Sequence, residues 1–358
     1  MCAPGATTID GEELDGVYEN WMKLPTPTEL EPTFFYGDHP LSGNKMNGLG
    51  EREKRRAQYV FHSNAKTGSL PWDRMQMYFR YTYPFWALPQ LLRNAWASFR
   101  PHGKLASKRR EFVDSNEAAQ NIKDKAIELG AGIVGICRMK KEFMVEGAST
   151  PYRYAISLGI PMRRDVMLKA PLVSSGMEVL NCYYKGSMLT VNLARYIRSL
   201  GWPAQGLPVN SSSECLHIPI ALEAGLGQLG KHGSLICKEY GANFRLTSVL
   251  TDLPLEGDSP IDIAVDDLCQ SCKVCVNECP PDAIFNEKQW VRGEEKWYVD
   301  FDKCVPYFSD NYGCAICLEV CPWSETGKGP KITSQLMKTR ERRSRGGNRI
   351  EDDNKSGS

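Results

Sequence analysis

Apolar residues in the middle of the chain recur either at helical spacing or in short runs. A capping-box pattern at Asp114 and Glu117 predicts the start of a helix. The apolar runs at 133–139 and 154–160 predict two buried strands. A long helix is predicted from about 175 to 200, because its apolar side chains return every three to four residues. Helix and strand alternate, so we expect an α/β or α+β core.

The pattern changes at both ends of this core. Residues 1–112 are rich in Pro, Gly and aromatic side chains, and we expect them to wrap a core rather than to form one. Residues 113–260 carry the helix and strand patterns, and residues 261–328 carry most of the cysteines. Residues 329–358 are charged and polar, which predicts a disordered tail.

Composition excludes several classes of protein. The chain has 358 residues, 42% hydrophobic and 24% charged, which is typical of a globular protein. Lys plus Arg is 44 against 43 for Asp plus Glu, so the overall charge favours no nucleic-acid partner. No apolar run is long enough to span a bilayer, and the first residues show no secretion signal. We therefore expect a cytoplasmic protein without a membrane span.

The cysteine spacing is the strongest chemical signal. Two runs end in the bacterial ferredoxin pattern CxxC-x3-CP: Cys269-x2-Cys272-x2-Cys275-x3-Cys279 and Cys304-x9-Cys314-x2-Cys317-x3-Cys321. In that pattern the fourth cysteine of each run binds the other cluster. The spacing predicts one [4Fe–4S] cluster on Cys269, Cys272, Cys275 and Cys321, and a second on Cys279, Cys304, Cys314 and Cys317. A zinc site, the alternative, is disfavoured by two such endings in one window, so residues 261–328 are predicted to be a ferredoxin-like domain.

One glycine motif needs separate interpretation. Gly225-x-Gly227-x-x-Gly230 matches the dinucleotide fingerprint, but a helix-like segment precedes it and a strand-like segment follows, which is the wrong order for a Rossmann site. We interpret these glycines, with the adjoining Lys231, as contacts that let the backbone approach a large flat cofactor.

Several segments together resemble the cobamide-dependent reductive dehalogenases. They are YIRSLGWPA (196–204), ALEAGLGQLGKHGSLICKEYGANFRLTSVLTDLPL (221–255) and GCAICLEVCPWS (313–324), and the resemblance covers roughly residues 115–325. It implies a corrinoid in a nitroreductase-like core, bound base-off without a protein histidine on cobalt. The chain agrees, since its five His are scattered and no DxHxxG motif occurs.

The same resemblance implies a reaction and its partners. A halogen of a small organohalide would be replaced by hydrogen, at a cobalt that can be reduced to a nucleophilic Co(I) state. Electrons would arrive singly through the two clusters from an external low-potential donor of the ferredoxin or flavodoxin type. The export signal of respiratory members is absent, so the chain is similar to a soluble, cytoplasmic member.

The resemblance also suggests catalytic residues. The family's proton-donating tyrosine falls on Tyr183 or on Tyr184, and Tyr183 is favoured by counting back from Gly201. The cation that favours its phenolate falls on Arg245, which we also predict to contact the corrinoid. The family's catalytic group has a third polar residue beside the tyrosine and the cation, and its best match in this chain is Asn210. Without the resemblance, packing in an amphipathic core would be the better explanation of the two tyrosines.

Two other functions remain open. An epoxyqueuosine reductase, which modifies transfer RNA, would share the cobamide-plus-two-cluster architecture. It would use an aspartate in an Asp-Tyr-His context, and this chain contains no DYH. A non-catalytic iron–sulfur electron-transfer protein would leave the tyrosine and Arg245 without a role. Four cysteines outside the motifs are predicted to be buried core residues: Cys137, Cys182, Cys215 and Cys237.

Overall fold

The computed structural model describes residues 42–58, 60, 79, 82–208 and 214–355. Its central sheet has the strand order β1 (Ile133–Arg138), β2 (Tyr154–Pro161), β6 (Phe244–Thr251) and β3 (Ala204–Leu207). Every pairing in this sheet is antiparallel. The two predicted strands are confirmed, and the core is α+β.

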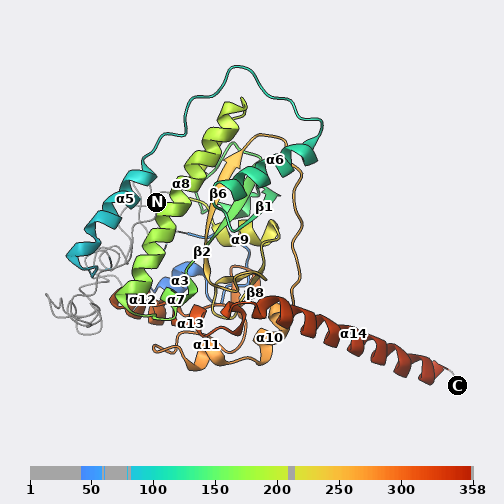
Figure 1. Ribbon diagram of the computed structural model, residues 1–358. Helices are drawn as coiled ribbons and strands as arrows, with labels where there is room; N and C mark the ends of the chain where they lie inside the picture. Colours follow the sequence, from blue (N-terminus) through green and yellow to red (C-terminus); the bar gives the residue numbers. More distant parts are fainter. Residues whose placement is uncertain (1–41, 59, 61–78, 80–81, 209–213, 356–358) are drawn as a thin grey trace.

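Side chains on the two faces of the sheet enter different hydrophobic clusters, as strand alternation requires. Ile156 and Leu158 of β2 pack in one cluster with α6 (Ser115–Glu128) and α8 (Val173–Ser199), whereas Ala155 packs in the other. Helix α9 (His217–Glu223) covers the second face. Figure 1 shows α8 running along the sheet as the longest helix of the core.

The two predicted helices are present. At the start of α6 the Asp114 carboxylate accepts hydrogen bonds from the backbone N–H groups of Asn116 and Glu117, at 2.9 and 2.8 Å. The Glu117 carboxylate accepts from the N–H of Val113, so both side chains satisfy free backbone donors at this terminus. Helix α8 begins two residues before the predicted start and ends at Ser199.

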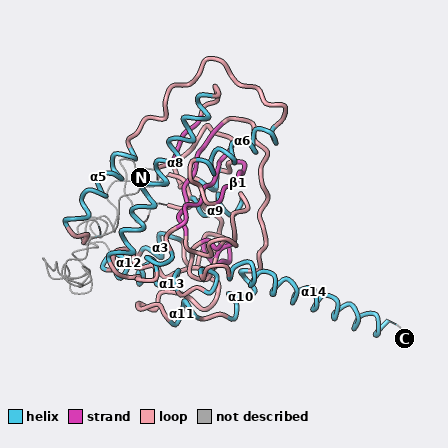
Figure 2. Tube along the Cα trace, viewed as in Figure 1, coloured by secondary structure: helices cyan, strands magenta, loops and turns pink. Residues whose placement is uncertain are grey.

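The remaining elements surround this core. Helix α5 (Leu88–Ser98) follows the 3-10 turn η1 (Phe85–Ala87) and packs on the outer side of α8 (Figure 1). The cysteine region consists of short helices and a hairpin joined by loops (Figure 2): α10 (Val265–Ser271), α11 (Val274–Asn277), β7 (Gln289–Val291), β8 (Glu294–Lys296), α12 (Phe301–Asp310), α13 (Ile316–Glu319) and η3 (Pro322–Ser324). Smaller elements complete the fold: α3 (Gly43–Asn47), η2 (Lys141–Phe143), α7 (Arg164–Met167), β4 (Gln228–Leu229) and β5 (Leu235–Ile236).

The prediction of a disordered tail is wrong for most of its length, because residues Lys328–Lys355 form helix α14. Its first turns carry Ile332 and Leu336, which pack against the core cluster four residues apart on one helix face. Thr333 is buried beside them. The low apolar content of the whole tail hid this short stripe, and the C-terminal part of the helix extends away from the core (Figure 1).

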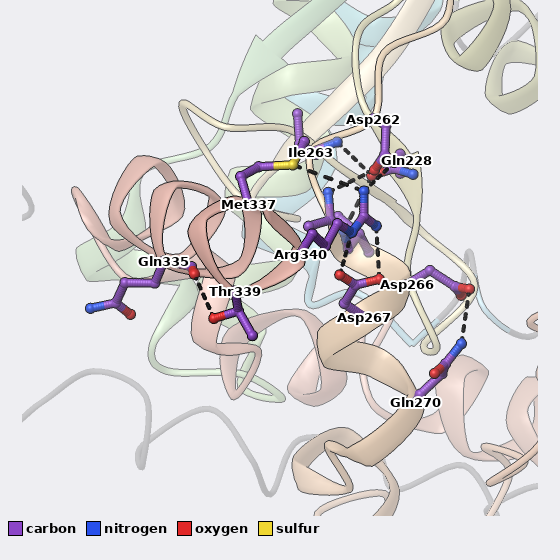
Figure 3. Close-up of polar contacts among 12 residues, drawn as sticks. Gln228, Asp262, Ile263, Asp266, Asp267, Gln270, Gln335, Met337, Thr339 and Arg340 are labelled. Atoms are coloured by element: carbon purple, nitrogen blue, oxygen red, sulfur yellow. Dashed lines mark hydrogen bonds and ion pairs between the residues drawn. The ribbon is translucent and has the colours of Figure 1, made fainter. Parts of the chain in front are cut away.

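An arginine fork anchors α14 to the cysteine region (Figure 3). The Arg340 guanidinium donates to both carboxylate oxygens of Asp267 on α10, at 2.5 and 2.7 Å, and to Asp262 just before that helix. These bonds hold the pKa of each aspartate below its usual range. Because α10 carries Cys269, the fork links the tail helix to a predicted cluster ligand.

Removing the fork is expected to loosen α14 without unfolding the core. Arg340→Gln should lower the free energy of unfolding by about 1 kcal/mol or less near neutral pH, since the three side chains are partly exposed. The two aspartates have depressed pKa values in the folded state, so this stabilisation exists above their unfolded pKa and disappears as the pH falls through the folded one.

Denaturant unfolding across this pH range and hydrogen exchange of α14 would measure both effects. Arg342→Gln, an exposed arginine two residues further along the helix, is the matched control. Equal exchange of α14 in the two variants would contradict an anchoring role for Arg340.

Candidate functional site

The centre of the site is a tyrosine on α8 facing an arginine on β6. Arg245 shares a sheet face with Val249, which packs in the cluster beneath α8, because side chains two and four residues apart on a strand point the same way. Its guanidinium carbon lies 5.7 Å from the centroid of the Tyr183 ring. This distance is within the range of a cation–π contact. The structure therefore brings together the two side chains that the sequence paired.

The neighbouring tyrosine faces a different helix. The guanidinium of Arg93 on α5 lies 4.3 Å from the centroid of the Tyr184 ring. Consecutive residues on a helix point about 100° apart, so the two tyrosines cannot both face Arg245. Of the two candidates that the sequence left open, Tyr183 is the one beside the cation.

Sequence reasoning missed a second tyrosine at this centre. Tyr83 is buried in a cluster with Leu180 and Tyr183, and its hydroxyl donates to the backbone carbonyl of Tyr312 at 3.2 Å. Burial raises the pKa of Tyr83 above its ordinary value, Tyr183 adds to the rise, and Arg245 opposes it. No local pattern could have identified Tyr83, because it lies a hundred residues from Tyr183 in an irregular segment.

The bond from Tyr83 joins this centre to the cysteine region. Tyr312 lies two residues before Cys314, and it meets α8 at Gly176. A Cβ atom at Gly176 would lie only 2.8 Å from the Tyr312 carbonyl oxygen and 3.0 Å from the Tyr83 hydroxyl. Gly176 therefore permits the close approach of these two segments, and Tyr183 lies two helical turns further along the same helix.

The first cysteine group lies together as the spacing predicted. One enclosed pocket is lined by its members, Cys269, Cys272, Cys275 and Cys321. The pKa of Cys275 is raised to about 11 and that of Cys321 to about 12, chiefly by burial and further by neighbouring cysteines of the group. Four thiols that line one pocket, three of them buried, would be the donor set of a [4Fe–4S] cluster, whose iron would displace their protons.

The second cysteine group consists of Cys279, Cys304, Cys314 and Cys317. The pKa of Cys304 is raised to about 12, chiefly by burial and further by Cys314 and Cys279. The pKa of Cys317 is also raised by burial, and among its charged neighbours is Cys275 of the first group. Cys279 thus lies with the second run and Cys321 with the first, which is the exchange of fourth cysteines that the ferredoxin pattern implies.

A buried lysine lies beside the first cysteine group. Lys231 is 1% exposed, and its ammonium donates to the carbonyl of Cys272 at 3.0 Å. The ammonium also lies 4.9 Å from the centroid of the Trp297 ring. We expected Lys231 to contact a corrinoid, but its neighbours are cysteines. A buried cation here fits the negative charge that four thiolates bring to a cluster.

The space beside each glycine of the Gly225–Gly230 motif is occupied by other parts of the chain. A Cβ atom at Gly225 would lie 2.5 Å from the carbonyl oxygen of Ser259, and one at Gly227 would overlap the carbonyl of Ile236. At Gly230 the space is taken by the side chains of Ile236 and His232. These contacts explain the three glycines by close packing of the chain, and their contact with a cofactor stays a prediction.

The other predicted residues are placed as follows. Asn210 lies outside the described residues. The four cysteines that were predicted to be core residues, Cys137, Cys182, Cys215 and Cys237, are buried in the hydrophobic clusters. The Nε atom of Arg245 is buried and has no hydrogen-bond partner among the residues that the structure describes, so this donor is available to a ligand group.

Comparison with known sequences gives one family match and several similar proteins. Residues 268–324 match the model of the 4Fe-4S dicluster domain. The tetrachloroethene reductive dehalogenase of Sulfurospirillum multivorans is 35% identical over 179 residues, which cover 48% of this chain and 35% of that protein. An epoxyqueuosine reductase of Leadbetterella byssophila is 34% identical over 133 residues, covering 32% of this chain and 39% of that protein.

Solved structures give the same picture. The catabolic reductive dehalogenase NpRdhA, in complex with 3-bromo-4-hydroxybenzoic acid, superposes with a TM-score of 0.63 at 28% identity, covering 69% of this chain and 38% of that one. The matched segment thus spans only about a third of the length of these relatives. Within the described ranges, no helix combines the length and apolar character needed to cross a membrane.

Proposed function

We propose that this chain belongs to the reductive dehalogenase family, to whose members it is similar in sequence and in fold, and that it replaces a halogen of an organohalide by hydrogen. The carbon–halogen bond breaks, the halide leaves, and a carbon–hydrogen bond forms, which consumes two electrons and one proton. The two cysteine groups would hold the clusters that deliver the electrons. The Tyr183–Arg245 pair between α8 and β6 would supply the proton.

The Tyr183–Arg245 pair is the observation that carries this proposal. A phenol can give its proton to carbon, and a guanidinium beside the ring stabilises the phenolate that remains. Phe79, Met177 and Tyr312 belong to the same hydrophobic cluster as Tyr183, so part of the surroundings of this ring is aromatic and apolar. Such surroundings favour a small apolar halide over a polyanionic substrate.

The proposed reaction needs two kinds of cofactor. The two cysteine groups would hold two [4Fe–4S] clusters, which supply one-electron transfer from an external donor of the ferredoxin or flavodoxin type. A corrinoid would supply a redox-active cobalt beside Tyr183. Arg245 fits such a ligand, because its buried Nε could donate to a peripheral amide of the corrinoid. In this arrangement Tyr183 holds the proton at its hydroxyl, and Tyr83 fixes the Tyr312 segment.

The alternative is an epoxyqueuosine reductase, which the sequence match to such enzymes supports. That reaction would need a carboxylic acid at the centre, whereas the sequence lacks the Asp-Tyr-His context. A catalytic tyrosine facing an arginine favours dehalogenation.

One experiment separates these reactions. The chain, reconstituted anaerobically with iron, sulfide and cobalamin, should bind about eight irons and show the absorption bands of cob(II)alamin. With reduced methyl viologen it should release halide from a panel of aryl, alkenyl and alkyl halides. Reduction of epoxyqueuosine in a transfer-RNA stem-loop, without halide release from any member of the panel, would refute dehalogenation. Loading with iron but no turnover of either substrate would indicate an electron-transfer protein.

A further inference from the structure

Helix α5 presents an apolar face outward. Five large side chains of α5 and its flanking residues, Phe85, Leu88, Leu92, Trp96 and Phe99, are between 55% and 84% exposed. Four of them follow one another at spacings of four, four and three residues, so they lie along one side of the helix. A contiguous row of this kind is uncommon on a monomeric soluble protein and marks a binding surface.

The opposite side of α5 is held firmly against α8. Asn94 and Ala97 are buried, and the Asn94 amide donates to the carbonyl of Leu180 at 3.0 Å. The amide of Gln90 reaches the same carbonyl at 3.4 Å. The helix is therefore fixed with its apolar face turned away from α8, as Figure 1 shows for its position on the outer side of that helix.

The charged residues of α5 and of the loop that follows it all have the same sign. Between Thr82 and Arg110 the sequence contains no Asp or Glu and six basic residues: Arg93, Arg100, Lys104, Lys108, Arg109 and Arg110. The net charge of the whole chain is close to zero, so the composition alone does not reveal this basic segment. The guanidinium of Arg100 lies 4.5 Å from the centroid of the Trp96 ring, so a cation adjoins the apolar row directly.

The basic residues after α5 belong to an ordered loop. Arg195 and Arg198 of α8 donate to the carbonyls of Pro101 and Gly103, at 3.0 and 2.9 Å. Farther along, the N–H of Arg110 donates to the carbonyl of Leu200 at 2.9 Å. Lys104, Lys108 and Arg109 are exposed on this loop. The apolar helix face and the basic loop are thus adjacent parts of one continuous segment.

We infer that α5 and the loop to Arg110 dock on an anionic lipid surface. A helix with tryptophan, phenylalanine and leucine on one side and basic residues at its edge lies in the interface plane of a membrane. The apolar side chains enter the acyl boundary, while lysine and arginine pair with acidic headgroups. RNA would match the basic charge but leave the leucines of the apolar row without a partner.

Vesicle flotation of the full, cluster-loaded chain tests this inference. Binding is expected to vesicles of equimolar phosphatidylcholine and phosphatidylglycerol, and only weakly to phosphatidylcholine alone. Leu92→Ser/Trp96→Ser/Phe99→Ser should lower the partition coefficient at least about a hundredfold. Lys104→Glu/Lys108→Glu should lower it at least about tenfold, and added salt should weaken the wild-type protein but affect this variant less.

The matched control removes three exposed apolar side chains elsewhere, in Val113→Ser/Ile127→Ser/Leu168→Ser. It should bind vesicles as the wild type does. The inference is overturned if the wild type does not bind anionic vesicles at low salt, or if the α5 triple variant binds equally well. It is also overturned if sedimentation shows a wild-type dimer that the α5 variant dissociates, or if the chain binds transfer RNA but no vesicles.

Discussion

Tyr183→Phe is expected to lower the rate of halide release at least about a hundredfold, with iron and corrinoid contents unchanged. General acid catalysis contributes roughly 10²- to 10⁴-fold in enzymes, and the phenylalanine ring keeps the packing while losing the proton. The centroid of the Tyr183 ring lies 5.7 Å from the Arg245 guanidinium carbon, and this charge would stabilise the phenolate after proton transfer. Steady-state halide release with reduced viologen, beside an iron assay and the corrinoid spectrum, measures the effect.

The adjacent tyrosine provides the matched control. Tyr184→Phe makes the same chemical change one residue away, where the ring contacts Arg93 instead, so its rate should stay close to that of the wild type. Arg245→Lys should be milder than Arg245→Met, because lysine keeps the charge and loses only the planar fork. If Tyr183→Phe retains near-normal halide release, the proton comes from another group and the proposed role fails.

Cys275→Ala is expected to abolish turnover and to reduce the iron content from about eight to about four per chain. A cubane needs four protein thiolates in this type of site, and Cys275 lines the pocket of the first group. Cys275 is also among the neighbours that raise the pKa of Cys317, so it lies on the side of the first cysteine group that faces the second. Loss of this cluster would interrupt the route between the two groups.

Iron analysis and electron paramagnetic resonance of the reduced protein measure the loss. Cys215→Ala, which changes an equally buried thiol outside both groups, should retain both clusters and most of the activity. Full iron content in Cys275→Ala would mean that the ligand assignment is wrong.

Local spacing explains what the sequence could predict. The cysteine runs, the cap at Asp114 and the strand at 154–160 each depend on residues close together in the chain, and the structure contains all three features. The exchange of Cys279 and Cys321 between the groups was also predictable, because the ferredoxin pattern fixes it. Counting back from Gly201 favoured Tyr183 over Tyr184, but which of the two rings lies beside Arg245 depends on where α8 meets β6 and α5.

The features that sequence reasoning missed depend on distant segments. Tyr83 reaches the site only because η1 and α5 fold back on α8. Lys231 follows the glycine motif, yet its side chain enters the cysteine region about forty residues further on, where it donates to Cys272. The tail appeared disordered from its composition, whereas a short apolar stripe and the Arg340 fork hold it as α14.

Helix α8 fixes the distance between two contacts, one with the segment before Cys314 and one with Arg245. Gly176 meets the segment before Cys314, and Tyr183 meets Arg245, on one rigid rod with a rise of about 1.5 Å per residue. Anyone transplanting this centre into another scaffold would therefore have to move α8, β6 and the Tyr312 segment as a single module. A one-residue insertion between Gly176 and Tyr183 would turn the tyrosine by about 100° and leave the arginine opposite a different side chain.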